Sequence, residues 1–357
     1  MKYYRYFKTI IIFAHVCIFK TMQKRITIKD IAKALKIHHS TVSRALRNDP
    51  RVNEITRDLV LAYAQKHEYQ TNMNAVQLRG TVNNTIALIV PNINHTFFSD
   101  IVSQLSNLAY QKGFIISVFQ SNEDYSQEVG IVNTIIKQNY AGVIASIAKN
   151  SINSAHFNLL KTFGIPLVFF DRVCGDIKTP KVLIDNYNIT YEATEYLIQK
   201  GYTRIAHVTG PSHINVFYDR QKGFADALQK HAVEYQRNMN IEDEFSEELG
   251  EKCLTELMAE TVKPDAIISS SILLTMGIAV QARKMSLQIP HDLALIGFGN
   301  HLSSLIMQPQ LTSIYQSEKE IAKISFELLD KMINKEIAIG EECTKVIKAQ
   351  IIYRESC

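Results

Sequence analysis

The sequence predicts a small N-terminal all-α domain followed by a large α/β body with doubly wound parallel sheets. Two patterns lead to this prediction. Residues 27–46 carry apolar side chains at helical spacing with one interruption, and after residue 84 short apolar runs alternate with amphipathic stretches, as in repeated β-α-β units. With 357 residues and 46% apolar side chains, the chain can form one small and one large core.

Residues 27–46 are predicted to form two short helices with a break at residues 36–38. Thr27 can cap the first helix, and Asp30, three residues further on, can complete a reciprocal cap. The apolar faces consist of Ile28, Ile31, Ala32 and Leu35 in the first helix and Ile37, Val42, Ala45 and Leu46 in the second. Two short helices joined in this way are typical of a helix-turn-helix.

The outer face of the second helix is predicted to be polar. It carries His39, Ser40, Thr41, Ser43 and Arg44. Because these side chains can bond phosphates or base edges, the two helices predict a DNA-binding domain. An ordinary solvated helical hairpin is the alternative.

A third helix is predicted over residues 53–64, which completes a three-helix headpiece. Asn53 is its expected N-cap, and its apolar positions at helical spacing are Ile55, Leu59, Ala62 and Tyr63. Residues 22–80 hold 11 lysines and arginines against 5 aspartates and glutamates, whereas the whole chain carries only +4. A basic headpiece on an acidic body suits a protein whose N-terminal part meets phosphates.

The cysteines indicate neither a metal site nor a disulfide framework. They are Cys17, Cys174, Cys253, Cys343 and Cys357, without a Cys-x-x-Cys pair or a histidine at ligand spacing. This scatter favours free thiols in a reducing cytoplasm. No glycine-rich phosphate-binding motif follows a predicted strand, so we expect no nucleotide cofactor.

The first 21 residues imitate a signal peptide, because basic residues precede an apolar run at residues 10–19. The run is too short to span a bilayer, His15 interrupts it, and no small-x-small cleavage site follows. We expect translation to begin at Met22 and residues 1–21 to be a non-native extension. A weak membrane anchor and a functional extension are the alternatives.

In the body, strands and helices are expected to alternate. The expected strands are residues 86–90, 114–119, 142–146, 167–170, 205–208, 266–268 and 293–296. The expected helices are residues 98–112, 123–138, 152–163, 187–200, 219–231, 247–260 and 274–284. Such alternation predicts parallel sheets with helices on both faces.

Several motifs together resemble one known family. In the headpiece they are IKDIA at residues 28–32, STVSRAL at 40–46 and TR at 56–57. In the body they are IPLVFFDR at 165–172, RIAH at 204–207, RQKGF at 220–224, IGF at 296–298 and RES at 354–356. The chain from about Met22 to its end therefore resembles the lac repressor (LacI/GalR) family of transcription regulators.

This resemblance implies a body with the two-lobed fold of periplasmic sugar-binding proteins and a cleft between the lobes. The headpiece is then expected at residues 22–70, and a hinge helix and linker at 71–84. The effector-binding and dimerisation body is expected at 85–357. Its first lobe would comprise about 85–184 and 315–340, and its second lobe about 185–313 and 341–357.

The resemblance also implies how the headpiece meets DNA. The second helix is expected to enter the major groove, where His39, Ser40 and Arg44 read bases. The expected phosphate contacts are Thr27, Thr41, Ser43 and Arg47. A hinge helix is expected to form on DNA from Asn72 onward, with Leu78 wedged into the minor groove. The alternative for Leu78 is a plain linker residue.

Two residues in the turn depart from the family's pattern. Lys36 stands where Gly is usual, and His38 stands where a Ser N-cap is usual. Because the turn requires left-handed backbone, Lys36 is expected to cost about 1 kcal/mol of headpiece stability.

The effector site implied by the resemblance centres on Asp171 and Arg220, which match positions that hold hydroxyl or carboxylate groups in relatives. Phe97 and Phe98 lie in a loop that shapes the cleft. Two polar contacts that are usual in the family are missing, and the nearest substitutes are Ser270, Ser271 and Asn300. The alternative is that Asp171 and Arg220 merely pair with other charges.

The resemblance therefore implies a sequence-specific transcriptional repressor, a homodimer on a pseudo-palindromic DNA operator, controlled by a small-molecule effector such as a sugar. A regulator controlled by a protein co-regulator and a sugar receptor without DNA function are the alternatives. An enzyme would need an acid/base set such as His207 and His213 near Asp171, but a histidine inside a strand is more often a core residue. We expect no catalytic activity and no cofactor.

Overall fold

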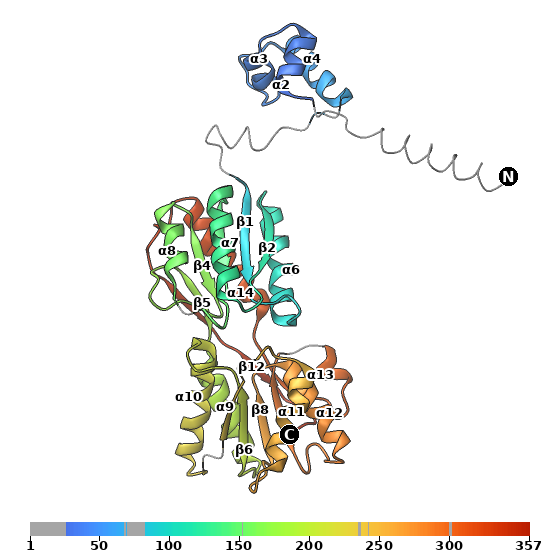
Figure 1. Cartoon of the computed structure of the whole chain (residues 1–357), viewed down its shortest axis with the longest axis vertical. Coiled ribbons are helices and arrows are strands. Elements are labelled where there is room, and N and C mark those ends of the chain that lie inside the picture. The colour runs from blue at the N-terminus through green and yellow to red at the C-terminus, as the bar shows by residue number, and fades with distance from the viewer. Residues whose placement is uncertain are drawn as a thin grey trace, which may run out of the picture. The chain divides into compact units, whose positions relative to one another are not determined.

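The computed structural model describes residues 26–67, 69, 83–151, 153–234, 237–241, 243–299 and 302–357. The chain divides into two compact units, one before residue 82 and one from residue 82 to the end (Figure 1). The N-terminal extension and the predicted hinge, with Asn72 and Leu78, lie outside the described residues, as does Asn300.

The first unit contains the three predicted helices. They are α2 (Ile28–Leu35), α3 (His39–Ala45) and α4 (Glu54–Lys66). Asp30 N–H donates to Thr27 Oγ1 at 3.3 Å, and Thr27 N–H donates to Asp30 Oδ2 at 2.9 Å, so the predicted reciprocal cap is confirmed. Asn53 caps α4 by accepting from Thr56 N–H at 2.8 Å, as predicted.

The turn between α2 and α3 has the backbone that the sequence predicted. Lys36 has φ 53° and ψ 38°, which is the left-handed region that disfavours a Cβ. His38 is the N-cap of α3, because its Nδ1 accepts from Ser40 N–H at 3.4 Å and lies 2.8 Å from Ser40 Oγ. An imidazole nitrogen thus accepts the capping hydrogen bond that a hydroxyl or carboxylate oxygen usually accepts at this position.

The apolar positions noted at helical spacing in α4 do not all face the core. Ile55 and Leu59 are exposed by 82% and 52%, whereas Val60 and Ala64 enter the headpiece core. The helix offers two overlapping apolar sets at helical spacing, so periodicity alone did not fix its rotation. Arg57 helps to fix it, since its Nη2 donates to the Val52 carbonyl at 2.9 Å and to the Asp49 carbonyl at 3.3 Å.

The second unit has two lobes, each with a six-stranded sheet, and this confirms the predicted doubly wound α/β body. In the first lobe the sheet order is β11-β5-β4-β3-β1-β2, and all pairs are parallel. Its elements are β1 (Thr85–Val90), α6 (Thr96–Gln111), β2 (Ile115–Gln120), α7 (Tyr125–Gln138), β3 (Gly142–Ala145), α8 (Ala155–Thr162), β4 (Leu167–Phe170), β5 (Lys181–Ile184), α14 (Glu318–Ile333) and β11 (Thr344–Ile347).

The second lobe has the order β12-β10-β9-β8-β6-β7, with only the β10–β12 pair antiparallel among the described strands. Its elements are α9 (Asn186–Gln199), β6 (Ile205–Thr209), α10 (Asn215–Lys230), β7 (Arg237–Asn240), α11 (Glu247–Ala259), β8 (Ala266–Ser269), α12 (Ile272–Lys284), β9 (Ala294–Phe298), α13 (Leu302–Ile306), β10 (Thr312–Tyr315) and β12 (Gln350–Ile352). Buried aliphatic and aromatic side chains fill the space between each sheet and its helices.

The last crossover between the lobes differs from the prediction. The chain was expected to return to the second lobe at residue 341, but β11 (Thr344–Ile347) pairs in parallel with β5 of the first lobe. The return therefore lies between Ile347 and Gln350. The sequence analysis also missed α14, which packs against α6 and buries Phe326 and Leu329 in the core of the first lobe.

We expect Lys36→Gly to stabilise the headpiece by about 1 kcal/mol, because glycine adopts left-handed backbone without a Cβ clash. Lys33→Gly is the matched control, since Lys33 is exposed and helical in the same element. It should destabilise by about 1 kcal/mol. Hydrogen exchange over residues 28–46 of the full chain measures both changes, with exchange about fivefold slower in Lys36→Gly. Faster exchange in that variant would contradict strain at this turn.

Candidate functional site: a DNA-reading helix and a cleft between two lobes

The polar face of α3 lies mostly where the sequence placed it. His39 and Arg44 are exposed, while Ser40 and Thr41 are partly buried. The His38 and His39 rings lie 4.1 Å apart at the start of the helix, so the cap and the first exposed side chain are in contact. Val42 and Ala45 face the core and fix the rotation of the helix.

Ser43 does not lie on the outer face, and this part of the prediction is wrong. Its exposure is only 7%, so the residue is buried. Arg47 contacts it from the surface: Arg47 Nε donates to the Ser43 carbonyl at 3.1 Å, and Nη2 donates to Ser43 Oγ at 3.3 Å. These bonds hold the Arg47 guanidinium close to α3.

Six of the seven residues named for the effector site line one cavity in the second unit. They are Phe97, Phe98, Asp171, Arg220, Ser270 and Ser271. The cavity has a volume of about 70 Å³ and takes residues from both lobes. Its walls follow the carboxyl ends of β1, β4, β8 and β9, which is where parallel sheets present their ligand-binding loops.

Arg220 is the best-anchored charge in the cavity, with an exposure of only 3%. Its Nε donates to Asn186 Oδ1 at 2.8 Å, and its Nη1 donates to the Ser270 carbonyl at 3.1 Å. The guanidinium carbon lies 3.5 Å from the centre of the Phe298 ring, so the two groups stack. Burial lowers the pKa of Arg220 to about 9.

Asp171 follows β4 and has φ 57°, a left-handed backbone that turns its side chain into the cavity. It is 5% exposed, and the described residues give its carboxylate no hydrogen-bond donor. Burial raises the pKa of Asp171, and the guanidinium groups of Arg172 and Arg220 offset that rise only in part. A buried carboxylate without donors is ready to accept hydrogen bonds from a ligand.

Ser270 and Ser271 replace the two missing polar contacts of the family only in part. Ser271 Oγ accepts from Leu273 N–H at 3.3 Å as the N-cap of α12. Ser270 Oγ donates to Thr209 Oγ1 at 2.9 Å. Both hydroxyls are therefore already engaged within the second lobe.

Sequence reasoning missed other lining residues. They include His95, Arg172, Phe217, Phe245, Phe298 and Gln316. Arg172 and Phe298 stand in the quoted motifs, so their position after a strand was the available signal. Phe217 and Phe245 had none, because α10 begins four residues earlier than predicted and the loop before α11 has no periodicity.

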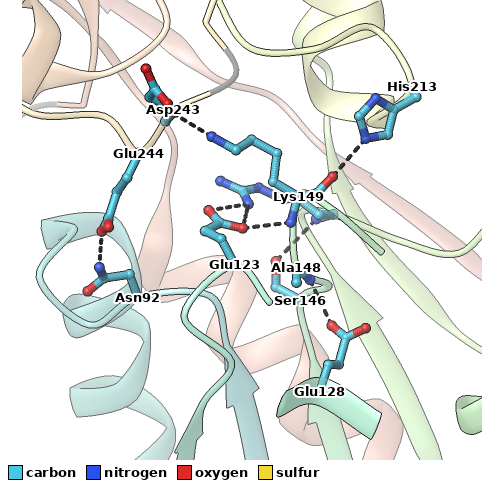
Figure 2. A network of polar contacts seen from close by, with 10 residues as sticks. Asn92, Glu123, Glu128, Ser146, Ala148, Lys149, His213, Asp243 and Glu244 are labelled. Atoms are coloured by element: carbon cyan, nitrogen blue, oxygen red, sulfur yellow. Dashed lines mark hydrogen bonds and ion pairs between the residues drawn. The ribbon is translucent and has the colours of Figure 1, made fainter. Parts of the chain in front are cut away.

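Polar contacts also join the two lobes (Figure 2). Lys149 Nζ from the first lobe donates to the Asp243 carbonyl, and His213 Nε2 lies 2.7 Å from the Lys149 carbonyl. Asn92 Nδ2 bonds Glu244 Oε1. We call these contacts the inter-lobe latch.

The latch rests on a rigid base in the first lobe. Arg172 Nη1 pairs with Glu123 Oε1 at 2.8 Å, and Glu123 Oε2 accepts from Lys149 N–H at 2.6 Å. Burial alone would raise the pKa of Glu123, but its bonds with Arg172 and Lys149 hold it below the usual value. Fully buried Glu128 accepts from Ala148 N–H at 2.7 Å (Figure 2). Residues 148–149 are thus fixed from two sides.

The two histidines considered for acid/base chemistry have structural neighbours. His207 is fully buried in β6, and its ring lies 5.1 Å from that of Phe224. His213 belongs to the latch. In the described part of the chain no three metal-ligating side chains cluster, and no helix there is long and apolar enough to cross a membrane.

Comparison with known proteins agrees with this architecture. Residues 27–72 match the family model of bacterial regulatory proteins of the lacI family, and residues 194–357 match the periplasmic binding protein-like domain. The chain therefore combines a lacI-family headpiece with a periplasmic binding protein-like body. It is therefore a DNA-binding transcriptional regulator whose headpiece carries the helix-turn-helix of that family.

Curated relatives named as regulators match this chain over nearly their whole length. It is 27% identical to catabolite control protein A of Priestia megaterium over 312 residues, which are 87% of this chain and 93% of that protein. It is also 27% identical to the transcriptional repressor CytR of Escherichia coli K12 over 341 residues, or 94% of this chain and 98% of CytR.

Solved structures show the same fold. The lac repressor dimer bound to operator and an anti-inducer matches with a TM-score of 0.80 at 19% identity, over 93% of this chain and 99% of that one. A LacI regulator from Alkaliphilus metalliredigens complexed with D-xylulofuranose matches with a TM-score of 0.68 at 26% identity, over 77% of this chain and 99% of that one.

We expect Asp171→Asn to stabilise the ligand-free protein by about 1 kcal/mol near neutral pH, because burial disfavours the carboxylate charge that Asp171 carries in the unfolded wild type. Since the folded pKa is raised, the wild type loses stability as the pH rises from the ordinary carboxyl pKa through the folded value. The gain should therefore vanish in acid, where both side chains are neutral.

Urea unfolding across this pH range measures the difference. Asp100→Asn is the matched control, because Asp100 is an exposed aspartate on α6. A less stable Asp171→Asn protein at neutral pH would show that nearby cations already compensate the carboxylate.

Proposed function

We propose that this regulator is a homodimeric repressor that binds a pseudo-palindromic DNA operator through α3 and is controlled by a small-molecule effector, such as a sugar, in the cleft. The capped helix-turn-helix, with His39 and Arg44 exposed on α3, carries the DNA part of the proposal. The cavity that joins buried Asp171 and Arg220 supports the effector part.

On the operator, α3 would lie in the major groove with His39 and Ser40 at its N-terminal end and Arg44 one turn further on. Arg44 has a guanidinium fork that suits the two acceptors of guanine. Thr27, Thr41 and Arg47 would contact phosphates and set the register. Asn72 and Leu78 belong to the proposed hinge helix, with Leu78 in the minor groove.

A homodimer follows from the symmetry of such operators, because two headpieces read two half-sites about one helical turn apart. The operator-bound lac repressor named above is a dimer, which supports the same assembly here. Formation of the dimer would also place two hinge segments side by side on the duplex.

For the effector, a sugar or a related small molecule fits the chemistry of the cleft. Asp171 would accept bonds from hydroxyl groups, Arg220 would donate to a hydroxyl or carboxylate, and Phe97 and Phe98 would cover a sugar face. Ser271 and Asn300 remain further candidate contacts. Ligand-bound neighbours support this class: one regulator, CelR, is solved with cellobiose and another with D-xylulofuranose.

Control would act through the angle between the lobes. An effector that binds residues of both lobes changes the balance between latched and unlatched arrangements. In a dimer this moves the two hinges relative to one another and so changes operator affinity. The protein would act by binding alone, without catalysis, a cofactor or a membrane.

Selection of DNA from a random pool with the full chain tests the DNA part. We expect enrichment of an inverted repeat, and binding to it should fall steeply with salt because phosphate contacts release counterions. Failure to enrich any repeat, with weak and uniform binding to all sequences, would contradict a specific regulator.

Arg44→Ala is expected to cost about 1–3 kcal/mol on the selected operator and to relax the preference at one base pair per half-site. Lys29→Ala, at an exposed position on α2, is the control that removes a charge without removing the proposed base contact. Fluorescence anisotropy on operator and on random DNA measures both. Equal loss on the two DNAs would contradict base reading by Arg44.

Arg220→Met should weaken effector binding about 10- to 100-fold, because a charge-assisted hydrogen bond contributes about 1.5–3 kcal/mol. Methionine fills much of the volume against Phe298. Arg283→Met, at an exposed position on α12, controls for the loss of a charge. Calorimetry with sugars, sugar acids and nucleobases identifies a ligand first and then compares the variants. Unchanged affinity in Arg220→Met would place the ligand elsewhere.

A further inference from the structure

A second cavity lies in the first lobe, apart from the cleft. Its volume is about 230 Å³, against about 70 Å³ for the cleft cavity. Its walls come from α8, the start of β4, the loop between β4 and β5, and the turn before β11. Figure 1 shows α8 on the side of this lobe where β4 and β5 lie.

This second cavity opens at the edge of the sheet opposite the cleft. Leu167, the first residue of β4, lines the second cavity, whereas Asp171 and Arg172, just after the last residue of β4, line the cleft. The loop after β4 runs back along the strand, and Thr179 Oγ1 donates to the Leu167 carbonyl. A ligand here would therefore not compete with one in the cleft.

The floor of the second cavity is apolar and buried. It is formed by Phe157, Ile165, Leu167 and Ile177. The hydroxyl of Thr179 is already bonded to the backbone, so it adds no open polar group. Because an apolar cavity of about 150 Å³ stays dry and holds a benzene molecule, this one has room for a single ring or a branched aliphatic body.

The mouth is basic. Lys161 and Lys178 line it, and the described residues give neither ammonium a hydrogen bond or an ion pair. Two carboxylates lie close to them. Asp176 also lines the cavity and accepts from Ser154 Oγ, whereas Glu342 pairs with Lys181 at 2.7 Å and interacts electrostatically with Lys178. The two ammonium groups outnumber the one carboxylate in the lining, Asp176. Beside an apolar floor they match an anion with an apolar body.

Gly340 gives the Lys161 ammonium its place at this mouth. A Cβ at Gly340 would lie 2.8 Å from Lys161 Nζ, and Gly340 has φ +93°, which a side chain rarely permits. The bare glycine therefore leaves space for the ammonium against the cavity wall.

We propose that this cavity binds a small monocarboxylic acid with a compact aromatic or branched aliphatic body. The body would rest on Phe157 and Leu167, and the carboxylate would lie between Lys161 and Lys178. This is a second ligand site on the regulator, and it does not depend on the identity of the cleft effector.

Fluorine NMR with 4-fluorobenzoate and the full-length protein tests the proposal. We expect saturable binding that is about three- to tenfold weaker in Lys161→Ala and for the uncharged probe 4-fluorobenzyl alcohol, since each comparison removes one charged contact. No saturable binding, or equal binding of acid and alcohol, would overturn the proposal.

Two further variants locate the probe. Asn158→Trp, at an exposed α8 position on the cavity wall, should fill the mouth and abolish binding. Thr162→Trp, exposed on the same helix outside the cavity lining, should leave it unchanged, as should Arg220→Met in the cleft. Thermal unfolding verifies that each variant is folded. Binding that survives Asn158→Trp or is lost in Arg220→Met would assign the probe to another site and overturn the proposal.

Discussion

Parallel pairing within each sheet is the constraint on which the body depends. When neighbouring strands run in one direction, all their carboxyl ends meet at a single edge, and the loops that follow are brought together. Here β1 and β4 of one lobe and β8 and β9 of the other deliver the side chains of the cleft. The topology therefore fixes where a ligand can bind before any side chain decides which ligand it is.

The cleft holds charge that the fold compensates only in part. Arg220 loses hydration when it is buried. Its hydrogen bonds to Asn186 and the Ser270 carbonyl and its stacking on the Phe298 ring compensate for that loss. The Asp171 carboxylate has no comparable set of donors among the described residues. A buried carboxylate without donors lowers the stability of the free protein, and a ligand with hydroxyl groups restores that stability on binding.

Most of the fold was predictable because local patterns determine it. The reciprocal cap of Thr27 and Asp30, the left-handed Lys36 and the β-α-β alternation all depend on neighbours in the sequence. The rotation of α4 depends instead on tertiary packing, and β11 depends on pairing with a strand some 160 residues earlier, so neither was predictable from periodicity. In the site, the sequence predicted residues that directly follow strands. It did not predict Phe217 and Phe245, because they lie at a helix start and in a loop that have no periodic pattern.

The inter-lobe latch explains how a small ligand can control so large a body. Its bonds join Lys149 to Asp243, His213 to Lys149 and Asn92 to Glu244, and each contributes about 1–3 kcal/mol. The total is a few kcal/mol, which lies within the differential affinity that one effector supplies. The chain passes between the lobes after β5, after β10 and after β11, so opening the latch changes their angle without separating them. Each lobe is held together by its own sheet, whereas the contacts between the lobes are weak. A ligand can therefore change the angle between the lobes without changing the fold of either lobe.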